Sequence, residues 1–230
     1  MRRPAKIDNA VKKRFAREEK KRAVATKTKR LFFLIVCEGE QTEPNYFGQL
    51  SKSMPKGAVD VQMEIEGAAR NTNSLVEYAK SYLTRSSRSY DRVWVVFDKD
   101  DFSDANFHDA IQNAKNNGMK AAWTNEAFEL WFLLHFQYVN HNMSRKDYQN
   151  YLEREVERVT GKKYTYKKND PTMHACLSAH GNQERAIEWA KKLEKTHTCT
   201  KYAIHNPCTR VHKLVEELKN PEEVWEEINV

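Results

Sequence analysis

The sequence has no long hydrophobic run and few cysteines. No window of this 230-residue chain reaches the roughly 18 consecutive apolar residues that a membrane-spanning helix needs, and charged residues rather than the apolar stretch of a secretory signal follow Met1. The four cysteines include no closely spaced pair, which argues against a disulfide framework and favours a reducing compartment. We therefore expect a soluble cytoplasmic protein with no membrane partner.

Two further absences concern bound groups. The GxxxxGK[ST] motif of nucleotide-binding P-loops is missing, so any ATP-driven step must come from a partner. His and Cys are dense between residues 174 and 208, but no CxxC or HxxxH pair occurs there. Because zinc sites depend on such spacing, we expect buried cysteines and surface histidines rather than a zinc site.

Positive charge is concentrated at the start of the chain. Thirteen of the 39 Lys and Arg residues fall in residues 1–30, against three acids, so this arm carries a net charge of +10 and the remainder −3. Such an arm can bind nucleic-acid phosphates without sequence preference. The candidate contacts are Arg14, Arg17, Lys21 and Arg22. A solvated or partly helical tail that serves only solubility is an alternative of about equal weight.

The rest of the chain alternates between strand-like and helix-like segments. Strands are predicted at residues 31–36, 61–65, 93–97 and 119–123. Helices are predicted at residues 44–53, 73–83, 105–117 and 126–138, and then at 144–159, 185–195 and 209–218. This order predicts an α/β fold with a mostly parallel sheet flanked by helices. We divide the chain into the arm, a core at 31–140 and a mainly helical C-terminal extension at 141–230 that packs on the core.

Acidic residues follow two of the predicted strands directly. The apolar run at 31–36 leads through Cys37 to Glu38, and the run at 93–97 leads to Asp98 and Asp100. Because the carboxyl ends of neighbouring parallel strands meet at one sheet edge, we expect these three acids to share a crevice. Clustered carboxylates repel one another, and a hard divalent cation such as Mg²⁺ or Mn²⁺ is the usual compensation. Each cluster alone is equally compatible with a solvated turn at a helix N-terminus.

Three more acids are weaker candidates for the same metal site. Glu43 follows Glu38 closely enough to lie at the rim of the crevice, and Asp101 extends the second cluster. Glu129 lies in an apolar segment, where an unpaired carboxylate costs on the order of several kcal/mol. It therefore needs a partner, which the metal, Lys99 or the start of a helix would supply. We expect the nearby His135 to be a packed core histidine.

A basic aromatic stretch occupies residues 162–168. Lysines interleaved with tyrosines can hold phosphates while the rings stack on unpaired bases. The candidate nucleic-acid contacts outside the arm are Lys99, Lys163, Tyr164, Tyr166 and Lys167. The alternative, which we favour slightly, is a surface loop that its tyrosines anchor to the domain.

Four segments together resemble one protein family. VCEGEQTEPNYF, VVFDKDDF, NEAFELWFLLHF and NPCTRVHKLVEEL are similar to the motifs of the RloB family, whose core resembles the Toprim domain of topoisomerases, primases and overcoming-lysogenization-defect nucleases. The resemblance implies a Toprim-like sheet, Glu38 as a catalytic acid/base or metal ligand, and Asp98 and Asp100 as Mg²⁺ ligands. It also implies a role in bacterial antiphage defence by abortive infection, often beside an ABC-like ATPase.

Three functions follow from these expectations. The leading one is a Mg²⁺- or Mn²⁺-dependent nuclease that acts on DNA or RNA, with tRNA among the candidate substrates. The others are a catalytically silent Toprim module that binds nucleic acid or an effector, and an interaction subunit that docks on an ATPase. The sequence leaves the choice of nucleic acid, the trigger and self-association open.

Overall fold

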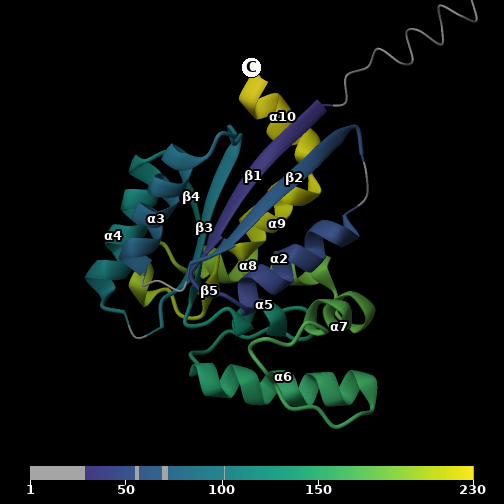
Figure 1. The fold of residues 1–230 in the computed structure, drawn as a ribbon. Coiled ribbons are helices and arrows are strands. Elements are labelled where there is room, and N and C mark those ends of the chain that lie inside the picture. The colour runs from purple at the N-terminus through teal and green to yellow at the C-terminus, as the bar shows by residue number, and fades with distance from the viewer. Residues whose placement is uncertain (1–28, 55–56, 69–71, 101, 230) are drawn as a thin grey trace, which may run out of the picture.

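A five-stranded sheet forms the centre of the protein (Figure 1). The structure is a computed structural model that describes residues 29–54, 57–68, 72–100 and 102–229. Its strands are β1 (Lys29–Cys37), β2 (Val59–Gly67), β3 (Arg92–Asp98), β4 (Lys120–Asn125) and β5 (Cys208–Thr209). They lie in the order β2-β1-β3-β4-β5, with the first four parallel and β5 antiparallel to β4. The predicted mostly parallel α/β sheet is confirmed, and it is consistent with a Toprim-like core.

Helices cover both faces of the sheet. They are α2 (Thr42–Ser53), α3 (Thr72–Arg85), α4 (Asp104–Asn116), α5 (Glu129–Leu133), α6 (Arg145–Thr160), α7 (Met173–His180), α8 (Gln183–Thr196), α9 (Val211–Lys219) and α10 (Pro221–Asn229). The helices α3 and α4 lie on one face, whereas α2 and α9 lie on the other and α6 runs below the sheet (Figure 1). None of the helices in the described residues combines the length and the apolarity that crossing a bilayer requires.

The central strand β1 is apolar throughout because both of its faces are buried. Phe33 and Ile35 pack in the core on the α2 side, whereas Leu34 and Val36 pack in the core on the α3 and α4 side. This alternation follows from the pleat, which points successive side chains to opposite faces. An uninterrupted apolar run is therefore the signature of this strand, as the sequence predicted.

The sheet has a topological switch point between β1 and β3. The chain runs from β1 to the edge strand β2, and it then crosses back to β3 on the other side of β1. In open α/β sheets the connections leave such neighbouring strands in opposite directions, which opens a crevice at their carboxyl ends. Glu38 and Asp98 lie at this point.

Two of the predicted helices are wrong in extent. The segment expected to be helical over 126–138 is helical only in α5. The backbone that precedes α5 instead bonds to the loop after β3, where the Asp100 N–H donates to the Glu126 carbonyl at 3.1 Å. The helix expected over 209–218 begins at Val211, because Cys208 and Thr209 pair with β4. The helices α7 and α10 were not predicted.

The core extends across residue 140, the predicted start of the C-terminal extension. Tyr148 and Leu152 of α6 are fully buried and belong to the same cluster as Phe33 of β1 and Trp131 of α5. Lys29 and Arg30, which we assigned to the arm, begin β1. Since one apolar cluster joins α6 to the sheet, we expect the two parts to unfold together.

Replacing Leu152 with Ala should lower the free energy of unfolding by about 2 to 5 kcal/mol, because it removes a fully buried side chain and leaves a cavity. Denaturant unfolding followed by far-UV circular dichroism should show one transition, shifted as a whole. The neighbouring Tyr151→Ala, which alters an exposed side chain, is the control and should shift it little. Two transitions, of which only one moves, would contradict a shared core.

Candidate active site

Glu38 and Asp98 lie side by side at the ends of β1 and β3. The Glu38 N–H donates to the Val96 carbonyl at 2.8 Å, which continues the ladder one residue beyond β1. The Asp98 N–H in turn donates to Glu38 Oε2 at 3.2 Å. The two acids that the sequence placed at one sheet edge are thus joined directly at the switch point.

Asp98 is buried, with an exposed fraction of 5%. Its Oδ2 atom accepts hydrogen bonds from the Phe128 N–H and from Arg145 Nη2, both at 3.0 Å. Its Oδ1 atom is also buried but has no hydrogen-bond partner among the described residues. Burial and the nearby Glu43 raise the pKa of Asp98, and Arg145 only partly opposes them. This carboxylate therefore has one oxygen without a partner among the described residues, and its negative charge is disfavoured by burial and by Glu43.

Asp100 stands on the turn that follows β3. Its φ of 38° lies in the left-handed region, which Asp tolerates better than most residues. Its side chain is one-third exposed and accepts from Arg145 Nη1 at 3.1 Å. Lys99, between the two aspartates, donates to the Phe102 carbonyl and lies 3.4 Å from Asp104, away from Arg145.

Glu43 and Glu129 complete the carboxylate site, by which we mean Glu38, Glu43, Asp98, Asp100 and Glu129. Glu43 lies in the first turn of α2 and is buried. A Cβ atom on Gly39 would come within 2.5 Å of Glu43 Oε2, so the glycine leaves room for this carboxylate. Burial, more than the charges of Glu129 and Glu38, raises the pKa of Glu43 to about 7.

Arg145 is the residue that sequence reasoning missed. It is the first residue of α6, and a capping box between Ser144 and Asp147 fixes this end of the helix. Besides contacting Asp98 and Asp100, its Nε atom lies 4.0 Å from Glu129 Oε2. No local sequence pattern predicts its contact with Asp98, because the two residues are 47 positions apart in the chain.

Glu129 contacts side chains of α6 rather than Lys99, which was one of the partners that the sequence left open. Glu129 is buried, and its Oε1 atom accepts from Gln149 of α6 at 3.1 Å while Arg145 approaches Oε2. It is also the first residue of α5, as one of the predicted alternatives required. Two side chains of α6, one helical turn apart, thus supply contacts for which the metal, Lys99 and the helix start had been the alternatives.

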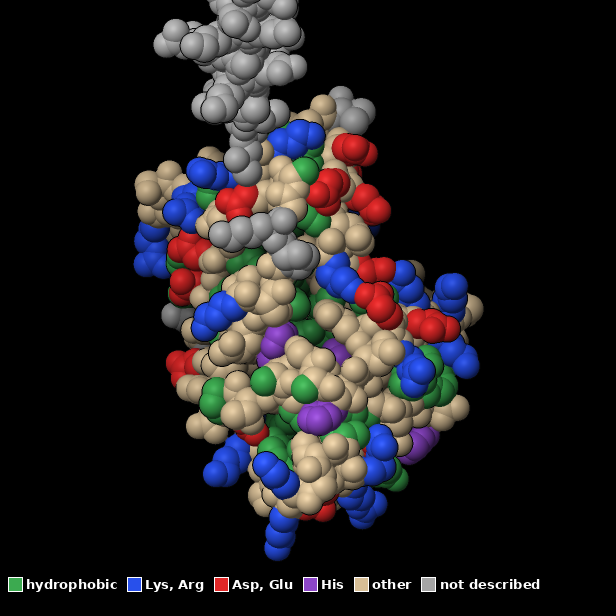
Figure 2. All heavy atoms as spheres, turned by 90° about the vertical axis from the view of Figure 1, so that its right-hand side faces the viewer, with side chains coloured by type: hydrophobic (Ala, Val, Ile, Leu, Met, Phe, Trp, Pro, Cys, Tyr) green, Lys and Arg blue, Asp and Glu red, His purple; other side chains and the backbone are tan. Residues whose placement is uncertain are grey.

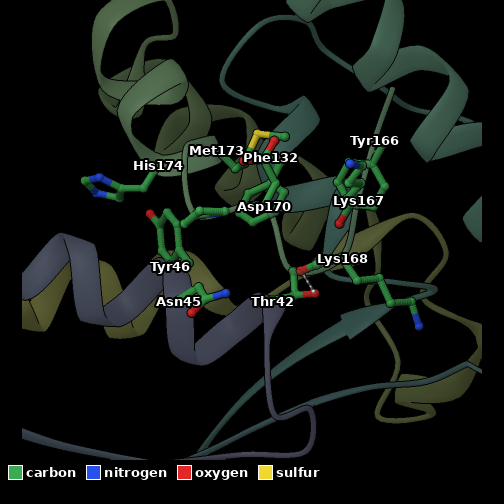
Figure 3. Close-up of a pocket in the computed structure, with 11 residues that line it drawn as sticks. Thr42, Asn45, Tyr46, Phe132, Tyr166, Lys167, Lys168, Asp170, Met173 and His174 are labelled. Carbon is green, nitrogen blue, oxygen red and sulfur yellow. Dashed lines mark hydrogen bonds between the residues drawn. The ribbon is translucent and has the colours of Figure 1, made fainter. Parts of the chain in front are cut away.

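A cavity of about 370 Å³ opens over the carboxylate site. Its lining includes Glu38, Glu43, Asp100, Glu129, Arg145 and Lys168. Figure 3 shows the adjoining pocket, in which the Thr42 hydroxyl donates to the Lys168 backbone carbonyl at 2.8 Å. This hydrogen bond joins the loop that contains Lys168 to the start of α2. Lys168 lines both the cavity over the carboxylate site and this adjoining pocket.

The basic aromatic stretch is a loop held by its tyrosines. The Tyr164 N–H donates to Glu157 and its hydroxyl to Asp170, at 2.9 and 2.7 Å, and the Tyr166 N–H donates to Glu153 at 2.9 Å. Both rings pack against the core, as the favoured alternative required, whereas the lysines at 162, 163, 167 and 168 are exposed. Lys and Arg side chains stand out at the lower end of the face in Figure 2, below the centre of the molecule. Contact of this loop with nucleic acid stays a prediction.

The histidines and cysteines were not expected to bind zinc. Cys199 Sγ lies 3.5 Å from His205 Nε2, and His197 stacks on His205. His135 is packed in the core, where burial lowers its pKa to about 4. Within the described ranges, no group of three or more His, Cys, Asp or Glu side chains is arranged so that it could hold a metal ion. Asp101 and the arm residues Arg14, Arg17, Lys21 and Arg22 lie outside those ranges.

Comparison with known families identifies the chain. It matches the family model described as RloB-like protein over residues 33–218. The chain belongs to the RloB-like protein family. No curated protein and no solved structure gives a significant match. In this RloB-like chain the matched region includes both acidic strand ends and α6, so Glu38, Asp98 and Arg145 all fall within it.

The stability of the metal-free RloB-like chain should fall as the pH rises from about 4.5 to about 7. Folding raises the pKa of Glu43 across this range, so the folded chain binds the proton more tightly and is relatively most stable at the acidic end. The change is up to about 3 kcal/mol. Urea unfolding in chelator at several pH values should show it in the wild type and a smaller fall in Glu43→Gln, which keeps the contribution of Asp98 in the same direction.

The matched control is Glu40→Gln, which alters an exposed carboxylate in the same turn and should keep the wild-type pH profile. Identical profiles for wild type and Glu43→Gln would contradict the raised pKa.

Proposed function

We propose that this RloB-like protein is a Mg²⁺- or Mn²⁺-dependent nuclease of a bacterial antiphage defence system. The observation that carries the proposal is the carboxylate site at the switch point, above all the buried Asp98 Oδ1 atom, which has no partner in the part of the chain that the structure describes. A hard divalent cation prefers oxygen ligands, and the site offers only carboxylates. The donor set therefore fits the metal that the family resemblance implies.

Asp98, Asp100 and Glu38 are the residues that would hold the metal, with Glu43 as a further ligand. When bound, such an ion activates water and stabilises the oxygen that departs from a phosphodiester. The raised pKa values of Asp98 and Glu43 are consistent with this assignment, because burial, with the neighbouring carboxylates, disfavours negative charge here and a bound cation would oppose that effect.

The chain's own residues would bind and orient the substrate. A phosphodiester is repelled by the carboxylates unless cations surround it, and Lys168 stands exposed at the rim of the cavity. Glu38, at the end of β1, is placed to transfer a proton or hold a metal. The lysines of the loop and the basic arm would extend the contact along the nucleic-acid backbone. DNA, RNA and tRNA remain candidate substrates.

Control by an ATPase partner is part of the proposal. The chain has no P-loop motif of its own, and RloB-like proteins resemble defence components found beside ABC-like ATPases. An unrestrained nuclease with a basic arm would damage its host. The isolated protein is therefore expected to cleave little, with activity appearing in the presence of the partner and a phage-derived trigger.

The alternative is a catalytically silent module that binds nucleic acid or an effector, or that docks on the ATPase. One observation favours it: Arg145 already pairs with Asp98 and Asp100, which is how structural acids are compensated. If replacing one carboxylate abolishes cleavage, the protein acts as a nuclease and not as a silent module.

Replacing Glu38 with Gln should reduce cleavage at least 100-fold, because the amide keeps the shape but loses the charge and the basicity of the carboxylate. Labelled DNA, total RNA and tRNA, incubated with the partner and a phage-derived trigger and with or without Mn²⁺, would show it. Glu40→Gln, in the same turn but exposed, should keep full activity. Undiminished cleavage by Glu38→Gln, or cleavage that persists in chelator, would refute the metal-dependent mechanism.

Removal of residues 1–28 should weaken nucleic-acid binding and flatten the dependence of log Kd on log salt, because fewer phosphates are neutralised. The deletion stops at residue 28 because β1 begins at Lys29. Fluorescence anisotropy with a labelled oligonucleotide over a salt series measures the slope. An unchanged slope would reject this role, and loss of ATPase co-purification instead would assign the arm to partner docking.

A further inference from the structure

Arg145 occupies the carboxylate site in the structure. Its Nη2 atom lies 3.0 Å from Asp98 Oδ2, and its Nη1 atom lies 3.1 Å from Asp100 Oδ2. Three-quarters of its side chain is buried, and Glu129 stands at the Nε side. One guanidinium thus spans three acids that come from the ends of β3 and α5.

The place of this arginine in its helix is unfavourable for a cation. It is the first residue of α6, where the helix dipole disfavours positive charge. Its Nε atom is buried and has no hydrogen-bond partner among the described residues. The helix dipole therefore does not stabilise the charge of this side chain, and its hydrogen bonding is incomplete. Attraction to the carboxylates is what holds the side chain in place.

The guanidinium holds one oxygen of each aspartate. Asp98 Oδ2 and Asp100 Oδ2 both bond to it, whereas the buried Asp98 Oδ1 has no hydrogen-bond partner among the described residues. At 4 Å, two unit charges near a protein surface repel by about 4 kcal/mol, and a divalent ion doubles this. A metal bound by both aspartates and the guanidinium in its present place would therefore compete for the same carboxylates.

We propose that Arg145 is the resident counter-cation of the carboxylate site: it holds Asp98 and Asp100 in the metal-free protein, and a divalent cation displaces it. The inference rests on the proposed metal site and adds an exchange of cations to it. This exchange explains why no group of three acids among the described residues is arranged to hold a metal ion. The aspartates are arranged around the arginine instead.

The displaced side chain remains at the cavity. The capping box keeps the backbone of Arg145 at the start of α6, and both Arg145 and Lys168 line the cavity. A guanidinium released from the aspartates then faces the space that a substrate phosphate would enter, and guanidinium groups bind phosphate well. Loading of the metal would in this way also prepare a phosphate contact.

Replacing Arg145 with Gln should tighten Mn²⁺ binding at least tenfold, because it removes both the competitor and its positive charge. Isothermal titration of metal-free protein with Mn²⁺ measures the affinity. Lys146→Gln, which removes one charge from the next, exposed residue of α6, is the matched control and should change the affinity little. Equal or weaker binding by Arg145→Gln would overturn the exchange and would make Arg145 a residue that positions the ligands.

A measurement on the wild-type chain keeps the test independent of how well Arg145→Gln folds. In protein labelled with ¹⁵N-arginine, the Arg145 Nε–H signal, assigned by its loss in Arg145→Lys, should shift or broaden on addition of Mg²⁺. The signal of Arg158, which pairs with Glu155 farther along α6, should stay unchanged. If titration shows that Mg²⁺ binds while the Arg145 signal does not move, the exchange is wrong but the metal site stands. If neither the wild type nor Arg145→Gln binds Mg²⁺ or Mn²⁺, both proposals fail.

Discussion

Carboxylates buried at the junction of β1 and β3 are the constraint on which the rest of the site depends. Glu43, Asp98 and Glu129 are each less than one-tenth exposed, and they lie beside Glu38 at the end of a hydrophobic strand. Burying charge in this way is costly unless the charge is paired or protonated. The arginine among the acids, the raised pKa of Glu43 and the hydrogen bonds from backbone amides are all responses to that cost.

This arrangement of buried carboxylates is not one that favours the stability of the fold. An apolar cluster of similar volume would often stabilise a fold as much as a compensated group of buried ions. Here one oxygen of Asp98 has no partner among the residues that the structure describes, so compensation within this part of the chain is incomplete. Buried groups with perturbed pKa values in a cleft are typical of functional sites. The placement of the site at the switch point of a parallel sheet supports the same conclusion.

The sequence predicted the parts of this site that local pattern determines. β1 and β3 are recognisable because a strand covered on both faces must be apolar along its length, and Glu38 and Asp98 are recognisable because they end those runs. Arg145 was not predictable, since its contact with Asp98 depends on how α6 packs under the sheet. The extent of α5 was predicted wrongly and β5 was missed for a related reason: hydrogen bonds to distant segments, rather than side-chain periodicity, determine where they begin and end.

The segments after residue 140 complete the site. The helix α6 contributes Arg145 and Gln149, and the following loop brings Lys168 to the cavity through its bond to Thr42. A movement of α6 would therefore change the charge balance at Asp98 and Asp100 without altering the sheet. A partner that binds this region would have a direct route to the carboxylates.

A crystal structure of the protein soaked in Mn²⁺, with anomalous data collected near the manganese edge, tests the account most directly. The account predicts an anomalous peak within coordination distance of Asp98, Asp100 and Glu38, with the Arg145 guanidinium moved away from both aspartates. A saturating soak that leaves the cavity without a peak, while Arg145 keeps its bonds to Asp98 and Asp100, would contradict it.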